Sequence, residues 1–257
     1  MSKLKINLMN LLILSKNFIK NNNEALLNLF FRGVAILCKF LMVIYILYKS
    51  NTSELGNYNI FSANIAIASL ILGFEFYNHS VREIIRCPEI KRLSLIKDQF
   101  IIHVLFYLTF YIIFKSFDFE KYILFFNFFL FISILESINQ QFFLILISLG
   151  KSTISSFQFF LRNALWFIIF LIVDFFNGQL DFQLTNFFTY WIFGLIVSLI
   201  YSFYYVIKYL DFKLFKFDFK YIKSGLKVSM VYIGGACVYK LYELGDRYII
   251  DFFLNKS

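Results

Sequence analysis

Proline, cysteine, histidine and charged residues are all scarce in this chain of 257 residues. It has one proline, three cysteines and two histidines, and only 16% of its residues are charged. The cysteines, Cys38, Cys87 and Cys237, lie far apart and have neither metal-binding nor redox spacing. His79 and His103 each stand alone, and a lone histidine is more often a packed side chain than a ligand. We therefore expect no metal centre and no cofactor.

The chain is rich in long apolar runs. Hydrophobic residues make up 60% of it, phenylalanine alone contributes 38 residues, and the mean hydropathy is +0.71. Runs of about 20 apolar residues are long enough to cross about 30 Å of hydrocarbon as helices. The sequence predicts an all-α polytopic transmembrane bundle of about seven spans in a bacterial cytoplasmic membrane. The expected spans are residues 25–48, 58–77, 99–114, 122–149, 153–173, 187–207 and 226–244.

These spans divide the chain into four expected parts. Residues 1–24 carry four lysines around a short apolar stretch and are interpreted as a cytoplasmic or interfacial helix. Residues 25–207 form a six-helix transmembrane bundle, and 208–225 form a basic cytoplasmic loop. Residues 226–257 hold the seventh span, which would begin a second bundle, and the C-terminus.

Basic residues alternate along the connections between the expected spans. They gather in the N-terminal stretch, after the second span, after the fourth and after the sixth, whereas residues 174–186 have none. Such alternation follows the positive-inside rule and places the N-terminus in the cytoplasm. It also explains the net charge of +9 through membrane topology and contacts with membrane lipids, so nucleic acid is not an expected partner.

Ionisable side chains inside the spans are the candidate functional residues, because each is costly in hydrocarbon. Arg32 and Lys39 lie seven residues apart and therefore share one helix face, with an offset of about 20°. We expect a cationic cavity between the first, fifth and seventh spans. The alternative is internal pairing of Arg32 or Lys39 with Glu136, and of Lys240 with Glu243. The candidate cavity residues are Arg32, Lys39, Arg162, Lys240, Glu75 and Glu136.

Three stretches resemble O-antigen and capsule flippases, the polysaccharide-exporter branch of the multidrug/oligosaccharidyl-lipid/polysaccharide exporter superfamily. The second span opens with Leu55-Gly56-Asn57-Tyr58 and closes with Leu72-Gly73-Phe74-Glu75. The turn before the fifth span is Gly150-Lys151, and the helix that follows contains Leu161-Arg162-Asn163-Ala164-Leu165-Trp166. The seventh span runs from Gly225-Leu226-Lys227 through Asp246-Arg247-Tyr248-Ile249-Ile250.

The resemblance implies a transporter built from two six-helix bundles around a central cavity. Members of the family move an undecaprenyl-pyrophosphate-linked oligosaccharide from the inner to the outer leaflet. On this basis the expected partners are that lipid-linked substrate and other membrane proteins of polysaccharide assembly. Because family members are longer, we expect this chain to be the N-terminal portion of a truncated or frameshifted exporter, inactive in transport by itself.

Three other function classes were weighed against a flippase. A membrane polymerase or acyltransferase would need a large outer loop or a catalytic histidine, and the sequence also lacks a phosphate loop and a nucleophile elbow. A drug or cation antiporter of the same superfamily would favour acidic residues in its lumen. A purely structural membrane protein remains the third alternative. We expect a transporter and not an enzyme.

Overall fold

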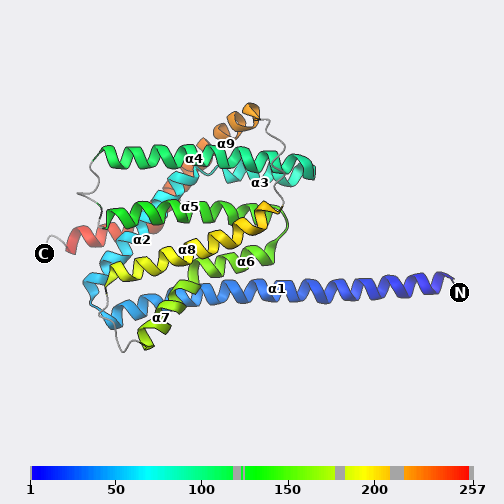
Figure 1. Ribbon diagram of the computed structural model, residues 1–257, viewed down its shortest axis with the longest axis horizontal. Helices are drawn as coiled ribbons and strands as arrows, with labels where there is room; N and C mark the ends of the chain where they lie inside the picture. Colours follow the sequence, from blue (N-terminus) through cyan, green and yellow to red (C-terminus); the bar gives the residue numbers. More distant parts are fainter. Residues whose placement is uncertain (1, 118–122, 124, 177–182, 209–216, 255–257) are drawn as a thin grey trace.

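The computed structural model describes residues 2–117, 123, 125–176, 183–208 and 217–254. All regular structure in these ranges is helical (Figure 1). The elements are α1 (Ser2–Lys49), α2 (Thr52–Gly73), α3 (Tyr77–Arg86), α4 (Glu89–Ser116), α5 (Phe126–Ser148), α6 (Ser152–Phe160), the π-helical turn η2 (Leu161–Leu165), α7 (Trp166–Phe176), α8 (Leu184–Ile207) and α9 (Phe219–Leu254). The predicted all-α polytopic bundle is confirmed.

Six of the expected spans fall in helices that are long and apolar enough to cross a membrane. Within the described ranges these candidate spans are Asn23–Lys49, Thr52–Gly73, Lys91–Ser116, Phe126–Ser148, Ser152–Phe176 and Leu184–Ile207. The expected seventh span lies in α9, which is long enough but is not among the six. Lys240, Glu243 and several tyrosines lower the apolar character of α9. By helix length and composition, the chain is a multi-pass membrane protein.

The helix ends that flank the basic connections lie at one end of the bundle, as the alternation of basic residues along the sequence predicts. In Figure 1, the links α3–α4 and α5–α6, the end of α8 and the start of α9 all lie at the end of the bundle from which the first half of α1 extends. The ends of α1, α4 and α7 and the starts of α2, α5 and α8 lie at the opposite end. The helix ends that flank the connections predicted to be cytoplasmic therefore share one face of the molecule.

Several expected boundaries differ from the structure, and α4, for example, begins at Glu89 and not at residue 99. The helix α1 runs without a break through the predicted boundary near residue 24. The predicted loop after the second span contains the ten-residue helix α3, whose polar and apolar side chains lie on different faces, as suits a helix at a surface. The predicted loop 208–225 is already helical from Phe219 onward, because Asp218 accepts a hydrogen bond from the backbone N–H of Tyr221 at 3.0 Å and caps α9.

The turn between α5 and α6 has the geometry that its sequence predicts. Gly150 has a φ of +73°, which glycine adopts without steric cost. The N–H of Lys151 donates to the carbonyl of Leu146 at 2.9 Å, and the N–H of Gly150 donates to that of Ile147 at 2.9 Å. This pairing satisfies carbonyls left free at the end of α5, as in a Schellman motif. It reverses the chain so that α6 packs back along α5.

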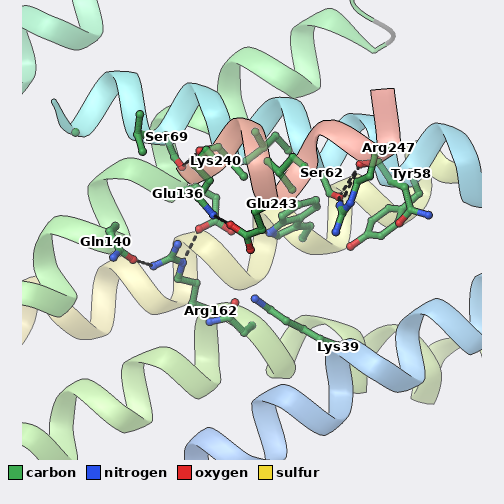
Figure 2. A pocket seen from close by; sticks show the side chains of 18 of the residues that line it. Lys39, Tyr58, Ser62, Ser69, Glu136, Gln140, Arg162, Lys240, Glu243 and Arg247 are labelled. Atoms are coloured by element: carbon green, nitrogen blue, oxygen red, sulfur yellow. Dashed lines mark hydrogen bonds and ion pairs between the residues drawn. The ribbon is translucent and has the colours of Figure 1, made fainter. Parts of the chain in front are cut away.

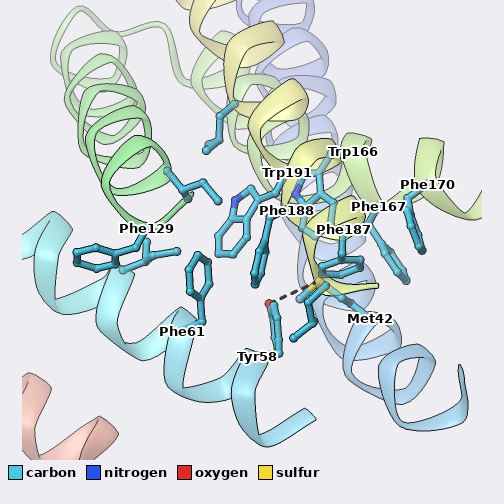
Figure 3. Close-up of a cluster of buried hydrophobic side chains, with 14 of the residues drawn as sticks. Met42, Tyr58, Phe61, Phe129, Trp166, Phe167, Phe170, Phe187, Phe188 and Trp191 are labelled. Carbon is cyan, nitrogen blue, oxygen red and sulfur yellow. Dashed lines mark hydrogen bonds between the residues drawn. The ribbon is translucent and has the colours of Figure 1, made fainter. Parts of the chain in front are cut away.

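The main core is a cluster of large aromatic side chains shared by α1, α2, α5, α7 and α8 (Figure 3). Trp166 and Trp191 stack with ring centroids 5.8 Å apart, and Phe61 stacks on Phe188 at 4.0 Å. Trp166 is 3% exposed, so it is a packing residue and not part of an aromatic belt. A second cluster joins α3, α4 and α5 to the start of α9. Together they hold the helices that surround the candidate site.

A buried carboxylate anchors the start of α9 to the rest of the bundle. Asp98 on α4 is 0% exposed, and its Oδ2 accepts a hydrogen bond from the N–H of Asp218 at 3.1 Å. Its Oδ1 lies 3.4 Å from the Nζ of Lys97. On the next turn, the hydroxyl of Tyr221 donates to the Oγ of Ser80 on α3 at 2.9 Å. These contacts fix the position from which α9 crosses the molecule.

We expect Asp98→Ala to lower the free energy of unfolding by about 1–3 kcal/mol, because it removes the hydrogen bond from the N–H of Asp218 to a charged acceptor. Glu83→Ala is the matched control. Glu83 pairs with Arg86 at 3.9 Å on an exposed face, and such pairs contribute about 0.2–1 kcal/mol. Unfolding of both variants in detergent, followed by circular dichroism, checks this expectation. Equal effects of the two substitutions would show that Asp98 does not anchor α9.

Candidate functional site

A pocket of about 540 Å³ opens between α1, α2, α5, η2, α8 and α9. Figure 2 shows side chains of α1, α2, α5 and α9 converging on it together with Arg162 of η2. Four cations line it, namely Lys39, Arg162, Lys240 and Arg247. Three carboxylates also line it, namely Glu75, Glu136 and Glu243. With four positive and three negative groups, the lining has a formal charge of +1.

Five of the six predicted site residues line this pocket, and Arg32 does not. The Nε of Arg32 donates to the Oγ of Ser156 on α6 at 3.3 Å, and its guanidinium lies 5.9 Å from the ring centroid of Phe143. The structure therefore places Arg32 outside this pocket, and a role for it in binding stays a prediction. Seven residues keep two side chains on one helix face, but they also separate them by about 10 Å along the axis. Over that length α1 passes from a segment that contacts α6, at Arg32, to a segment that lines the pocket, at Lys39.

Arg162 is held by a buried acceptor pair on α5. Its Nε contacts the Oε2 of Glu136 at 2.5 Å, and its Nη1 donates to the Oε1 of Gln140 at 2.6 Å. The other oxygen of Glu136 accepts the indole N–H of Trp191 from α8 at 3.1 Å. Glu136 thus pairs with Arg162, and not with Arg32 or Lys39 as the pairing alternative had it. The network joins α5, η2 and α8 at the wall of the pocket.

A π-helical turn places Arg162 in that network. The turn Leu161–Leu165 interrupts the helix between α6 and α7, and the side-chain amide of Asn163 donates to the carbonyl of Phe159 at 2.8 Å. Such turns insert one residue into a helix and change the direction of the side chains that follow, and they are frequent at functional sites. No glycine or proline occurs in this turn, so local sequence preferences do not indicate it.

Lys240 and Glu243 form an ion pair on α9, as the pairing alternative predicted. The Nζ of Lys240 lies 2.5 Å from the Oε2 of Glu243, one helical turn away. Glu243 keeps 44% of its side chain exposed at the mouth of the pocket. The pair therefore neutralises one cation of the lining and leaves a carboxylate at its edge.

Lys39 and Arg247 are the cations without a carboxylate partner in the lining. Among the described residues, Lys39 forms no hydrogen bond or ion pair, and Figure 2 shows its side chain reaching toward the centre of the pocket. In the described part of the chain, the guanidinium of Arg247 donates only to neutral acceptors, the Oγ of Ser62 at 3.2 Å and the carbonyl of Asn59 at 3.4 Å. From the sequence, Arg247 was assigned as readily to the end of the helix as to a site. The sequence feature that could have assigned Arg247 to the site is its position one helical turn after Glu243.

A break between α2 and α3 closes one end of the pocket. Phe74 and Glu75 both have positive φ, 47° and 51°, although neither is glycine. Such conformations cost about 1–3 kcal/mol each and persist where surrounding structure imposes them. Glu75 accepts a hydrogen bond from the amide of Asn78 at 2.6 Å. Burial, with Glu75 acting in the same direction, raises the pKa of the Tyr77 phenol to about 12, so it remains a neutral donor at the pocket.

No family model, curated protein or solved structure matches this chain. The function must therefore be argued from the pocket and from the spans around it. Polar groups that can donate or accept hydrogen bonds line it beside the charges, including Asn59, Ser62, Ser69, Gln140 and Gln141. Two cations without acidic partners, surrounded by neutral polar groups, are suited to an anionic ligand that also carries hydroxyl groups.

Proposed function

We propose that this protein takes part in moving an undecaprenyl-pyrophosphate-linked oligosaccharide across a bacterial cytoplasmic membrane. The observation that carries the proposal is the presence of Lys39 and Arg247, both without a carboxylate partner, in one pocket among apolar helices. Lys39 lies ten residues before Lys49, the last residue of its candidate span, which is about 15 Å along a helix. That depth is near the middle of a bilayer about 30 Å thick.

A charge at that depth needs water, a counter-ion or a polar ligand. A pyrophosphate supplies two or more negative charges and several acceptor oxygens, which suit a lysine and an arginine together. The neutral lining groups suit sugar hydroxyls, and the apolar faces of the flanking helices suit a polyprenyl chain. The likeness of Leu55–Tyr58, Leu161–Trp166 and the stretch through Asp246-Arg247 to exporter motifs supports the same substrate class.

Binding of fluorescent undecaprenyl pyrophosphate to the purified protein in detergent tests the proposal. We expect Lys39→Gln and Arg247→Gln each to weaken binding about tenfold or more, because a charge-assisted hydrogen bond contributes about 1.5–3 kcal/mol. Arg32→Gln is the matched control, since it removes a cation from the same helix as Lys39 but outside the pocket.

Transport is tested by reconstituting the protein in vesicles that carry the fluorescent lipid, with its headgroup quenched from outside. Equal binding by all three variants would remove the pocket as the pyrophosphate site. Exchange between leaflets by the wild type that is lost in Lys39→Gln would support the transport step, whereas binding without exchange is the result expected of a chain that is inactive in transport by itself.

A further inference from the structure

A buried histidine lies behind the wall of the pocket and has one ring nitrogen without a partner. His103 on α4 is 1% exposed, and its Nδ1 lies 2.7 Å from the carbonyl oxygen of Gln99, one helical turn earlier. Because a carbonyl can only accept, Nδ1 carries the hydrogen of the neutral ring and Nε2 is left as an acceptor. Nε2 is buried and has no hydrogen-bond partner within the described part of the chain. The neutral ring therefore leaves a buried lone pair unsatisfied, which is costly.

A carbonyl at the end of α2 is suited to a proton on Nε2. The ring lies against the carbonyl of Gly73, the last residue of α2. With Nδ1 bound to Gln99, Nε2 is the nitrogen that remains for this carbonyl. A lone pair on Nε2 cannot bond to an acceptor. A proton on Nε2 would turn it into a donor to Gly73, while Nδ1 would keep its bond to Gln99.

The end of α2 also favours a positive charge at this position. The last carbonyls of a helix carry a partial negative charge, which stabilises a nearby cation. The carbonyl of Gly73 accepts the N–H of Phe76 at 3.1 Å, and its second lone pair can accept another donor. Directly after Gly73 come Phe74 and Glu75, whose positive φ forms the break at one end of the pocket. A bond from His103 would therefore tie α4 to the residue before that break.

No charged side chain among the described residues forms a hydrogen bond or ion pair with the ring of His103. Its ring neighbours are Phe76, Phe106 and Tyr107, with centroids 6.0, 6.2 and 6.1 Å away. The charge of His103 is therefore set by its own proton and not by an ion pair. The titratable groups on the elements around it have contacts of their own. They are Glu75, which binds Asn78, Tyr77, which binds Glu75, His79, which packs on Tyr221, Asp98, which binds the N–H of Asp218, Tyr107, which binds Ser137, and Glu136, which binds Arg162.

Two contacts place the ring directly behind the pocket wall. Gly73 and Gln141 both line the pocket, and the Oε1 of Gln141 accepts the side-chain amide of Gln99 at 2.7 Å. We propose that His103 is a proton-binding site, in which the imidazolium joins the carbonyl of Gln99 on α4 to the carbonyl of Gly73 on α2. A bound proton adds one positive charge behind a lining that already holds four cations and three carboxylates.

Proton binding at His103 and anion binding in the pocket should strengthen each other, a consequence that rests on the proposed function. The imidazolium attracts an anion, and by linkage the anion favours the imidazolium by the same factor. Affinity for the pyrophosphate lipid therefore rises as the pH falls through the pKa of His103. Couplings between two sites typically amount to about 5- to 150-fold. The pocket would thus release its anion more readily at high pH.

NMR of protein with isotope-labelled histidine nitrogens tests the proton site without any substrate. The chain has only two histidines, so His79→Gln leaves the signals of His103 alone. Between about pH 8 and pH 5, the range in which histidine changes charge, we expect the ring to convert from the Nδ1–H tautomer to the imidazolium. A ring that stays neutral at about pH 5, or one that shows the Nε2–H tautomer at about pH 8, would overturn the proposal.

The linkage is tested by binding of fluorescent undecaprenyl pyrophosphate to wild type, His103→Gln and His79→Gln. Between about pH 8 and pH 5.5, we expect the affinity of wild type and of His79→Gln to rise about fivefold or more relative to His103→Gln. The comparison removes the effect of pH on the lipid, because all three proteins bind the same lipid. Equal pH dependence in all three would contradict the coupling. If none binds the lipid at either pH, the proposed function fails, whereas the NMR titration still decides the proton site.

Discussion

Glu136→Ala should lower the free energy of unfolding by about 3–5 kcal/mol, the typical cost of removing one partner from a buried ion pair. Glu136 is 6% exposed, and the side chain of Arg162 is 14% exposed. Without Glu136, the guanidinium keeps only Gln140 as an acceptor, and the indole N–H of Trp191 has none. An uncompensated cation would then remain between α5 and η2. Unfolding by SDS titration, followed by circular dichroism, measures the loss.

The double variant Glu136→Leu with Arg162→Met is the control for this prediction. It removes both charges, and replacing a whole buried pair by apolar groups of similar size is often neutral or stabilising. We therefore expect most of the lost stability to return. If the double variant were as unstable as Glu136→Ala, the packing of these side chains and not their charges would determine stability at this site.

The positions of the spans could be predicted from the sequence because hydrocarbon imposes a simple requirement. A crossing helix must be apolar over about 20 residues, and this pattern is visible without any knowledge of packing. The predicted and observed helices accordingly agree for residues 187–207, which lie within Leu184–Ile207. The helix α9 meets that requirement least well. Lys240 and Glu243, which line the pocket, reduce its apolar character.

The irregular parts of the helices could not be predicted, because distant contacts impose them. Phe74 and Glu75 adopt positive φ although neither is a glycine and Gly73, which precedes them, is still helical, and Arg162 lies in a π-helical turn with no proline or glycine nearby. Both irregularities border the pocket, and they depend on how α2 packs against α5 and how η2 packs against α8 and α1. Local sequence preferences carry no information on such contacts.

The structure brings five of the six candidate residues to one pocket, and it pairs Glu136 with Arg162 and not with Arg32 or Lys39. The high cost of charge in hydrocarbon selected five residues that do converge on one pocket. Helix periodicity correctly placed Arg32 on the same face of α1 as Lys39. It did not predict which element Arg32 contacts, because that depends on the position of the residue along the helix axis. The same limit applies to Glu136, whose partner comes from η2. Which cation remains without a partner, and hence where an anion can bind, is a property of the packed bundle.

Gly194→Ala should lower the free energy of unfolding by about 3 kcal/mol, at the upper end of the usual cost of overpacking. A Cβ at this position would lie 2.6 Å from the Cβ of Trp166 and 2.8 Å from its Cδ1. Trp166 has no room to move, because it is 3% exposed and is stacked on Trp191. The helix α8 would have to shift away from α7, which would disturb the aromatic cluster.

The matched control for Gly194→Ala is Gly33→Ala. Gly33 is also in a helix interior, but an added Cβ there would meet no atom within 4 Å. Alanine is favoured over glycine in a helix by about 0.5–1 kcal/mol, so this variant should be slightly more stable than wild type. Trp166 and Trp191 are the only tryptophans of the chain, so their fluorescence reports the cluster directly during unfolding. Equal stability of the two variants would show that α8 can withdraw from Trp166 at little cost. We expect Gly194→Ala to lower the stability and Gly33→Ala to raise it, because only at Gly194 does the close approach of α8 to Trp166 leave no room for a Cβ. That approach holds one wall of the pocket in place.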